Sequence, residues 1–324
     1  MLAALLLGTA GIGVHASAAT DSEDTIGVRL LEAPVSRKDD PRARTYIVDH
    51  LSPDSTITRR MEVSSTSATA QHVELYAGAA TIEGHAFTLA PDRKVNELTT
   101  WTSLDTQHVE LPPHGRATAE VTIKVPPDAS PGERYGVVWA EGGGAPDAPG
   151  NIRMVSRVGI RMYLDIGPGG EPASDFQVDN LTPARDADGR PRVTAQVHNT
   201  GGRAVDLGGS LSLSAVTGGL TAGPFPVQMG TTLALGDTAP VTVLLDKSLP
   251  DGPWKVELKL TSGLIERTVS GTLTFPPPDH IGAAMAPDRS GGWARLPSSA
   301  LGLGLIPAAG LSVWYLRKRA RTRV

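Results

Sequence analysis

Short runs in which apolar and polar residues alternate set the limits on what this chain can fold into. Residues 117–125 carry Ala, Ala, Val, Ile and Val at every second position, with polar residues between them. Ile57, Met61 and Val63 alternate with polar residues in the same way. Side chains of a β-strand point to opposite faces in turn, so a period of two predicts strands with one buried face. The chain is therefore predicted to be all-β.

Turn sequences separate these runs. Residues 112–115 (PPHG) and 126–132 (PPDASPG) combine proline and glycine as tight turns do. Residues 135–140, which follow the second turn, are apolar at odd and even positions alike. A strand that is apolar on both faces is predicted to be central in a sandwich. Seven or eight short strands between residues 26 and 166 are typical of an immunoglobulin-like β-sandwich.

A second sandwich is predicted after a short linker. Residues 168–174 (PGGEPAS) separate a first sandwich, residues 20–167, from a second, residues 175–276. In the second, residues 193–197 and 254–260 again alternate between apolar and polar side chains. The fold class predicted for the body is two tandem immunoglobulin-like β-sandwiches.

The C-terminal region predicts one transmembrane α-helix. Residues 296–316 carry no charged side chain, and as a helix they would span about 31 Å, the thickness of a bilayer core. Trp293 and Trp314 would lie at the membrane interfaces, and the basic tail 317–324 would be cytoplasmic. Residues 277–295, rich in proline and glycine, would form a stalk. A buried core helix is the alternative for the apolar run.

The N-terminus predicts a secretory signal peptide over residues 1–19. Residues 1–14 are apolar, and Ala16-Ser17-Ala18 fits the small-x-small pattern of a signal peptidase site. No basic residue precedes the apolar run, so we expect the true start to lie upstream; an uncleaved anchor is the alternative. Together the two ends predict a single-pass cell-membrane protein with an extracellular body.

Composition narrows the class of partner. Of the 30 Lys and Arg, five lie in the tail and Arg295 borders the apolar run, which leaves 24 against 34 acidic residues in the body. This acidic excess argues against nucleic acid, whose binding needs a basic surface. The chain has no cysteine, and with its many Ala and Gly residues this favours a bacterial surface protein over an exported eukaryotic one.

Known catalytic and metal-binding motifs are missing from the sequence. It contains no P-loop, no G-x-S-x-G, no HExxH and no Cys/His metal spacing. We predict no catalytic residue, no metal and no cofactor. His50 beside Asp49, and His72 near Glu74, could belong to an acid–base site, but exposed histidines are the simpler interpretation.

Two further features have both a functional and a structural interpretation. Residues 186–189 (DADG) resemble the start of a calcium loop but lack its later ligands, which favours a hairpin turn. Trp101 lies in a polar stretch and is the candidate binding residue, because an exposed Trp can stack on a sugar or anchor a partner. Packing of Trp101 in the core is the alternative.

The order of these pieces also matches a known pattern. It consists of the early Gly27-Val28 strand, residues 57–66, Trp101 ahead of residues 109–113, and above all residues 125–138 (VPPDASPGERYGVV). In these respects residues 26–166 resemble the N-terminal peptidoglycan-binding domain of the WxL-interacting proteins of Gram-positive bacteria. The family shares the layout of signal, tandem sandwiches, membrane span and basic tail. Residues 175–275 match its second domain poorly.

The resemblance implies a non-enzymatic surface protein that contacts peptidoglycan, surface partner proteins, or both, through its first sandwich. The alternative is a structural or chaperone-like accessory subunit of a cell-envelope protein complex. An enzyme comes third, because the sequence shows no convergent polar pocket. Pairing of a partner strand with an open sheet edge is the binding mode that a sandwich makes available.

Overall fold

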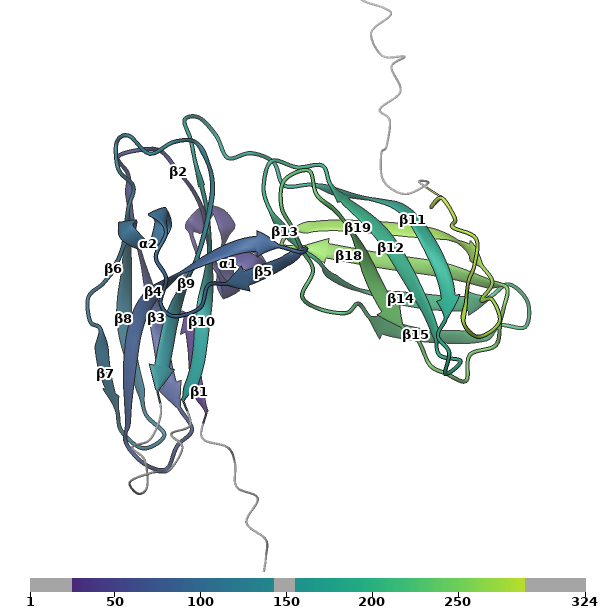
Figure 1. The fold of residues 1–324 in the computed structure, drawn as a ribbon, viewed down its shortest axis with the longest axis horizontal. Coiled ribbons are helices and arrows are strands. Elements are labelled where there is room, and N and C mark those ends of the chain that lie inside the picture. Colours follow the sequence, from purple (N-terminus) through teal and green to yellow (C-terminus); the bar gives the residue numbers. More distant parts are fainter. Residues whose placement is uncertain (1–24, 143–154, 289–324) are drawn as a thin grey trace, which may run out of the picture. The chain divides into compact units, whose positions relative to one another are not determined.

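The protein is described by a computed structural model over residues 25–142 and 155–288, and β-strands make up most of it (Figure 1). Two short α-helices, α1 (Pro41–Thr45) and α2 (Glu97–Trp101), and a 3-10 turn at Val35–Arg37 interrupt the strands. The all-β prediction is confirmed, and the strands form sandwiches.

The strands up to residue 166 form two facing sheets. One has the order β1-β3-β8-β6, with bounds β1 (Ile26–Leu30), β3 (Thr56–Ser65), β8 (Arg116–Lys124) and β6 (Thr102–Leu104). The other has the order β2-β10-β9-β4-β5, and β7 also pairs with β4. Its bounds are β2 (Ile47–Leu51), β10 (Ser156–Ile166), β9 (Gly132–Gly142), β4 (Gln71–Glu83), β5 (Ala86–Leu89) and β7 (His108–Leu111).

The alternating residues of these strands fill the space between the two sheets. Met61 and Val63 of β3 and Ile123 of β8 are fully buried in one hydrophobic cluster, together with apolar residues of β4, β9 and β10. Burial of this apolar surface is the main force that holds the two sheets together. The period of two therefore predicted the buried face of β3 and β8 correctly.

The strands from residue 176 onward form a second pair of sheets with its own core. The sheet orders are β17-β12-β11-β20 and β15-β14-β18-β19, and β13 pairs with β16. The buried cluster between them includes Trp254 and Leu258 of β18. The bounds are β11 (Phe176–Arg185), β12 (Pro191–Asn199), β13 (Val205–Asp206), β14 (Gly208–Ala215), β15 (Thr221–Pro226), β16 (Thr232–Leu233), β17 (Thr238–Leu244), β18 (Trp254–Ser262), β19 (Ile265–Leu273) and β20 (His280–Ile281).

A buried arginine joins residues far apart in the sequence. Arg203 is 1% exposed, and its Nε donates a hydrogen bond to Oε1 of Glu133 at 2.7 Å. The backbone N–H of Ala204 donates to the other oxygen of Glu133 at 2.8 Å, and Glu171 also pairs with Arg203. A buried ion pair is tolerated only when its remaining hydrogen bonds are made, as they are here. The described residues up to Pro287 belong to one unit.

Several predicted segments fall outside the described residues. They are the signal peptide over 1–19, the apolar run 296–316, the basic tail 317–324 and the end of the stalk 277–295. Within residues 25–142 and 155–288, no helix has the length and apolar character needed to cross a membrane. The predicted transmembrane helix over residues 296–316 lies outside these residues.

Two leucines test the core of β18. Leu258 is fully buried, whereas Leu264, in the turn that follows β18, is 67% exposed. We expect Leu258→Ala to lower the free energy of unfolding by about 3 kcal/mol, through lost burial and the cavity left behind. Leu264→Ala should change it by less than about 0.5 kcal/mol. Chemical denaturation followed by circular dichroism measures both, and equal effects would contradict the described core.

Candidate functional site

The path of the chain at its described N-terminal end leaves part of β10 unpaired. β1 pairs antiparallel with β3 in one sheet, whereas β2 pairs parallel with β10 in the facing sheet. The chain therefore changes sheets between Leu30 and Ile47. β2 reaches only Met162–Ile166 of β10, and among the described residues Ser156–Arg161 pairs with β9 alone. We call the side of Ser156–Arg161 that faces away from β9 the open edge.

The open edge offers backbone hydrogen bonds to an incoming strand. In an antiparallel pair, successive residues direct their N–H and C=O groups to opposite sides of the strand. Alternate residues of Ser156–Arg161 therefore bond to β9, and the others present both groups outward. No described strand pairs with these outward groups, and such a row of donors and acceptors is a template for another chain. The structure thus supplies a six-residue pairing surface.

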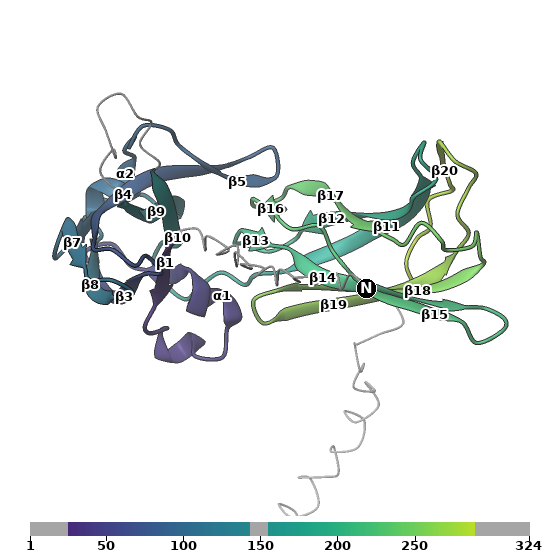
Figure 2. The ribbon, with the colours of Figure 1, turned by 90° about the horizontal axis from the view of Figure 1, so that it is seen from below.

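Apolar side chains lie beneath the open edge, where the two sheets meet. Ile160 of β10 is buried and Val158 half-buried against the core, and Ile26 and Val28 of β1 pack on the same cluster. Figure 2 shows β1 beside β10, in agreement with their contacts. Ile26 fits because Gly142 has no side chain: a Cβ there would lie 2.2 Å from Cδ1 of Ile26. We call Ile26, Val28, Val158 and Ile160 the apolar seam.

Arginines flank the open edge on the outer face of the sheet. The guanidinium of Arg157 lies 4.3 Å from the ring centre of Trp139, and that of Arg161 lies 4.8 Å from the ring centre of Phe87. Cation–π contacts of this kind hold the cation over the ring face. Arg157 is exposed, so a strand added at the open edge would have a basic side chain beside it.

The other half of β10, Met162–Ile166, has a strand partner on each side and is buried on both faces. Tyr163 is fully buried, its hydroxyl donates to Oδ1 of Asp206 at 2.7 Å, and Arg42 lies 4.2 Å from its ring centre. Burial raises the pKa of Tyr163 well above its ordinary value, and burial likewise raises the pKa of Tyr135. The contrast confines the candidate site to Ser156–Arg161.

Several other edges of the described sheets are blunted by proline or short, whereas the nine-residue edge strand β19 pairs with β18 alone and contains no proline. Pro224 and Pro226 lie in the edge strand β15, and Pro240 lies in the edge strand β17. Proline has no backbone N–H and blunts an edge against pairing. β6 and β7 have only three and four residues. Ser156–Arg161 contains no proline.

The candidate residues from the sequence have different surroundings. Trp101 ends α2, is partly buried, and packs against the core of the first pair of sheets; its binding role stays a prediction. His50 forms hydrogen bonds with Oδ2 of Asp165 at 2.6 Å and with the carbonyl of Gly169 at 3.2 Å. Residues 186–189 form the turn between β11 and β12, closed by a hydrogen bond from Gly189 N–H to the carbonyl of Asp186.

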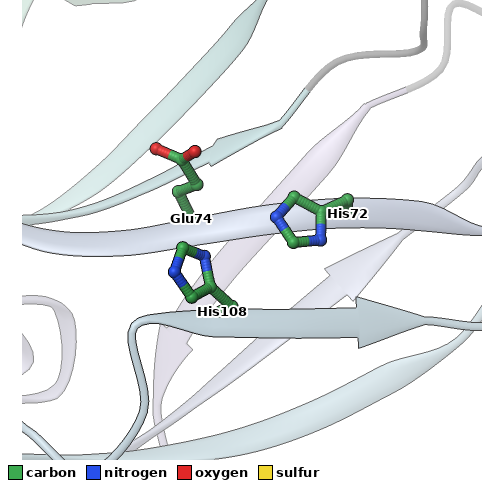
Figure 3. Close-up of side chains that lie close together, drawn as sticks. All are labelled: His72, Glu74 and His108. Atoms are coloured by element: carbon green, nitrogen blue, oxygen red, sulfur yellow. The ribbon is translucent and has the colours of Figure 1, made fainter.

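One group of side chains could hold a metal ion. His72 and Glu74 of β4 and His108 of β7 offer ligand atoms that all lie within 4.8 Å of one another (Figure 3). The sequence singled out His72 and Glu74 but not His108, which lies 36 positions after His72. One signal was present: the pentapeptide QHVEL occurs at residues 71–75 and again at 107–111.

Comparison with known proteins gives a distant structural likeness. No family model matches the chain, and no curated protein matches it. Among solved structures, the YadV chaperone matches with 10% identity and a TM-score of 0.40, covering 76% of this chain and 99% of that chain. The class 5 fimbriae chaperone CfaA matches with 13% identity and a TM-score of 0.34, with the same coverage. The Salmonella enterica SafA pilin in complex with the SafB chaperone matches with 10% identity and a TM-score of 0.40, covering 75% and 95%.

These findings correct the family prediction. The resemblance to the WxL-interacting proteins is wrong: no family model matches the chain, and the solved structures named above are chaperones or a chaperone complex, not members of that family. Peptidoglycan binding and the Gram-positive assignment fall with it. The single-pass cell-membrane localisation with an extracellular body and a cytoplasmic tail, predicted from the two ends, is corrected as well, since no helix among the described residues can cross a membrane. The physical reason for the wrong resemblance lies in residues 125–138, which form the turn that follows β8 and the start of β9. Strand–turn–strand patterns of this kind suit any sandwich and identify no single family.

Tyrosine ionisation tests the closed half of β10. Because the folded state raises the pKa of Tyr135 and Tyr163, it keeps protons that the unfolded chain loses above about pH 10. Stability should therefore fall as pH rises beyond about 10. We expect absorbance at 295 nm to show a late ionisation that coincides with alkaline unfolding, and Tyr163→Phe to reduce its amplitude. Ionisation of every tyrosine near pH 10 with native circular dichroism would contradict the burial.

Proposed function

We propose that this chain is a non-enzymatic, chaperone-like accessory subunit of a cell-envelope protein complex, which binds a partner protein by pairing with one of its strands at the open edge of β10. The observation that carries the proposal is the six-residue stretch Ser156–Arg161, which has a strand partner on one side only among the described residues. Strand addition to an exposed edge derives its affinity from main-chain hydrogen bonds and its specificity from alternate side chains.

The side chains around the open edge define the partner strand. Its inward residues would face the apolar seam, where Val158 and Ile26 are only partly buried, so apolar side chains at every second position fit. Its outward residues would lie beside Arg157, so acidic or polar side chains fit there. The preferred partner is therefore an extended segment with alternating apolar and polar residues.

Site-specific photocrosslinking in cells tests where the partner binds. A photoreactive phenylalanine analogue at Ser156 or Arg157 should crosslink to a protein, with the crosslinked peptide mapped by mass spectrometry to an alternating segment. Lys255 is the control, because it is exposed on β18, a strand paired on both sides. Equal crosslinking at Lys255, or none at the open edge, would contradict the proposal.

Hydrogen exchange of the purified complex tests the binding mode. We expect alternate amides of Ser156–Arg161 to exchange at least tenfold more slowly once the partner is bound, because pairing supplies their missing acceptors. Amides of Met162–Ile166 should already be protected in the free chain, since β2 and β9 flank them. A complex that leaves exchange at Ser156–Arg161 unchanged would show that the partner binds elsewhere.

Val158→Asp provides the loss-of-binding variant. Val158 is half-buried at the apolar seam, so a charge there opposes an apolar partner side chain, and recovery of the complex should fall at least tenfold. Val155→Asp is the matched control, since Val155 is 50% exposed and precedes β10. Melting temperatures of both variants identify any loss that comes from unfolding. Equal recovery of the two folded variants would contradict a role for the seam.

A further inference from the structure

The two copies of the pentapeptide QHVEL pair with each other in the sheet. The copy in β4 runs antiparallel to the copy in and just before β7, with Val73 opposite Val109, His72 opposite Glu110 and Glu74 opposite His108. Both valines are buried in the core, so the residues beside them point to the outer face. Antiparallel pairing of identical sequences thus places two histidines and two glutamates on one face in crossed positions.

The two imidazole rings lie one over the other. The ring centres of His72 and His108 are 5.4 Å apart with an interplanar angle of 22°, and Glu74 comes from the same strand as His72 (Figure 3). The ligand atoms of the three residues lie within 4.8 Å of one another. Ligands around a tetrahedral Zn²⁺ lie about 3.4 Å apart, given bonds of about 2.1 Å. Because these side chains are exposed or half-exposed, they can rotate and bring their ligand atoms from within 4.8 Å to the shorter separation of a zinc site.

Glu110 already orients one of the histidines. Nδ1 of His72 lies 2.5 Å from Oε1 of Glu110. A carboxylate only accepts hydrogen bonds, so the imidazole carries its proton on Nδ1 and leaves the Nε2 lone pair available. A carboxylate on the far nitrogen of a metal-binding histidine fixes its tautomer and ring orientation in the same way.

Glu74 is held by a partner that has other contacts. Nη2 of Arg93 pairs with the carboxylate of Glu74. Arg93 also donates to Oε1 of Glu141 at 3.1 Å, and its guanidinium lies 4.0 Å from the ring centre of Tyr76. Arg93 therefore keeps two partners when Glu74 turns away from it, so Glu74 can move to a cation without leaving Arg93 unpaired.

We propose that His72, His108 and Glu74 form a binding site for a divalent transition-metal ion, with Zn²⁺ the ion best suited and Glu110 orienting His72. Two imidazoles and one carboxylate are a ligand set that favours Zn²⁺, Cu²⁺ and Ni²⁺ over Mg²⁺ and Ca²⁺, which prefer oxygen ligands. The bound ion would join β7 to β4. β7 has four residues and β4 is its strand partner, so a metal bridge would strengthen its attachment.

Calorimetric titration of the tag-free full chain with ZnCl₂ tests the site. We expect one ion per chain with a micromolar Kd, and weaker binding as pH falls, because protonated imidazole cannot bind a metal. His72→Gln combined with His108→Gln should weaken binding at least tenfold. His198→Gln is the matched control, since His198 lies on β12 and contacts Thr238, and it should leave binding unchanged.

Two further measurements separate the site from adventitious binding. Co²⁺ should give the strong visible absorption of a tetrahedral complex with the parent chain and lose it with the double variant. Mg²⁺ and Ca²⁺ should give no heat in the same titration. The absence of Zn²⁺ binding, or Zn²⁺ binding unchanged in a double variant that keeps its melting temperature in EDTA, would overturn the proposal.

Discussion

Everything proposed for β10 depends on how the N-terminal segment divides between the two sheets. Had the chain continued from β1 along one sheet, it would have covered a single edge for its whole length. Instead Leu30 ends its pairing with β3, and Ile47 begins parallel pairing with β10. The change of sheet closes the sandwich at two points, and it leaves Ser156–Arg161 without a second strand among the described residues. The apolar seam lies beneath this stretch, and its residues Ile26, Val28 and Val158 are therefore only partly buried.

In the half of β10 formed by Met162–Ile166, both the backbone and the outer face of the strand are covered by neighbouring residues. Around Tyr163, neighbouring strands satisfy the backbone, and aromatic and charged side chains cover the outer face. Arg203 lies beneath, donating to the backbone carbonyls of Asp49 and Tyr163 at 3.3 Å as well as to Glu133. Removing one partner of such a buried pair costs about 3–5 kcal/mol, so the network fixes its neighbours in one arrangement. Among the described residues the open half has a strand on one side only, and this is why we place the proposed partner strand there.

Sequence patterns predicted the parts of the fold that depend on neighbouring residues. The alternation at 117–125 became β8, and that at 254–260 became β18, because a period of two reports one buried face directly. Pairing could not be predicted in this way, since β2 and β10 are more than a hundred residues apart. The short helix that ends at Trp101 was also not predicted. Its start depends on a local hydrogen bond between the Asn96 side chain and the backbone, which no periodic pattern reports. The family resemblance failed because strand and turn patterns are shared by unrelated sandwiches.

The two candidate sites lie in one row across the same sheet. His108 of β7 stands opposite Glu74, Glu74 opposite Glu141 of β9, and Glu141 opposite Arg157 of β10. Tyr76 connects the row, because its hydroxyl donates to Oε2 of Glu141 at 2.6 Å and accepts from Arg157 at 3.3 Å. A cation that draws Glu74 away from Arg93 leaves that arginine to Glu141, the carboxylate that faces Arg157. The charge beside the open edge is therefore linked, hydrogen bond by hydrogen bond, to Glu74, which stands opposite His108 at the other edge of the sheet.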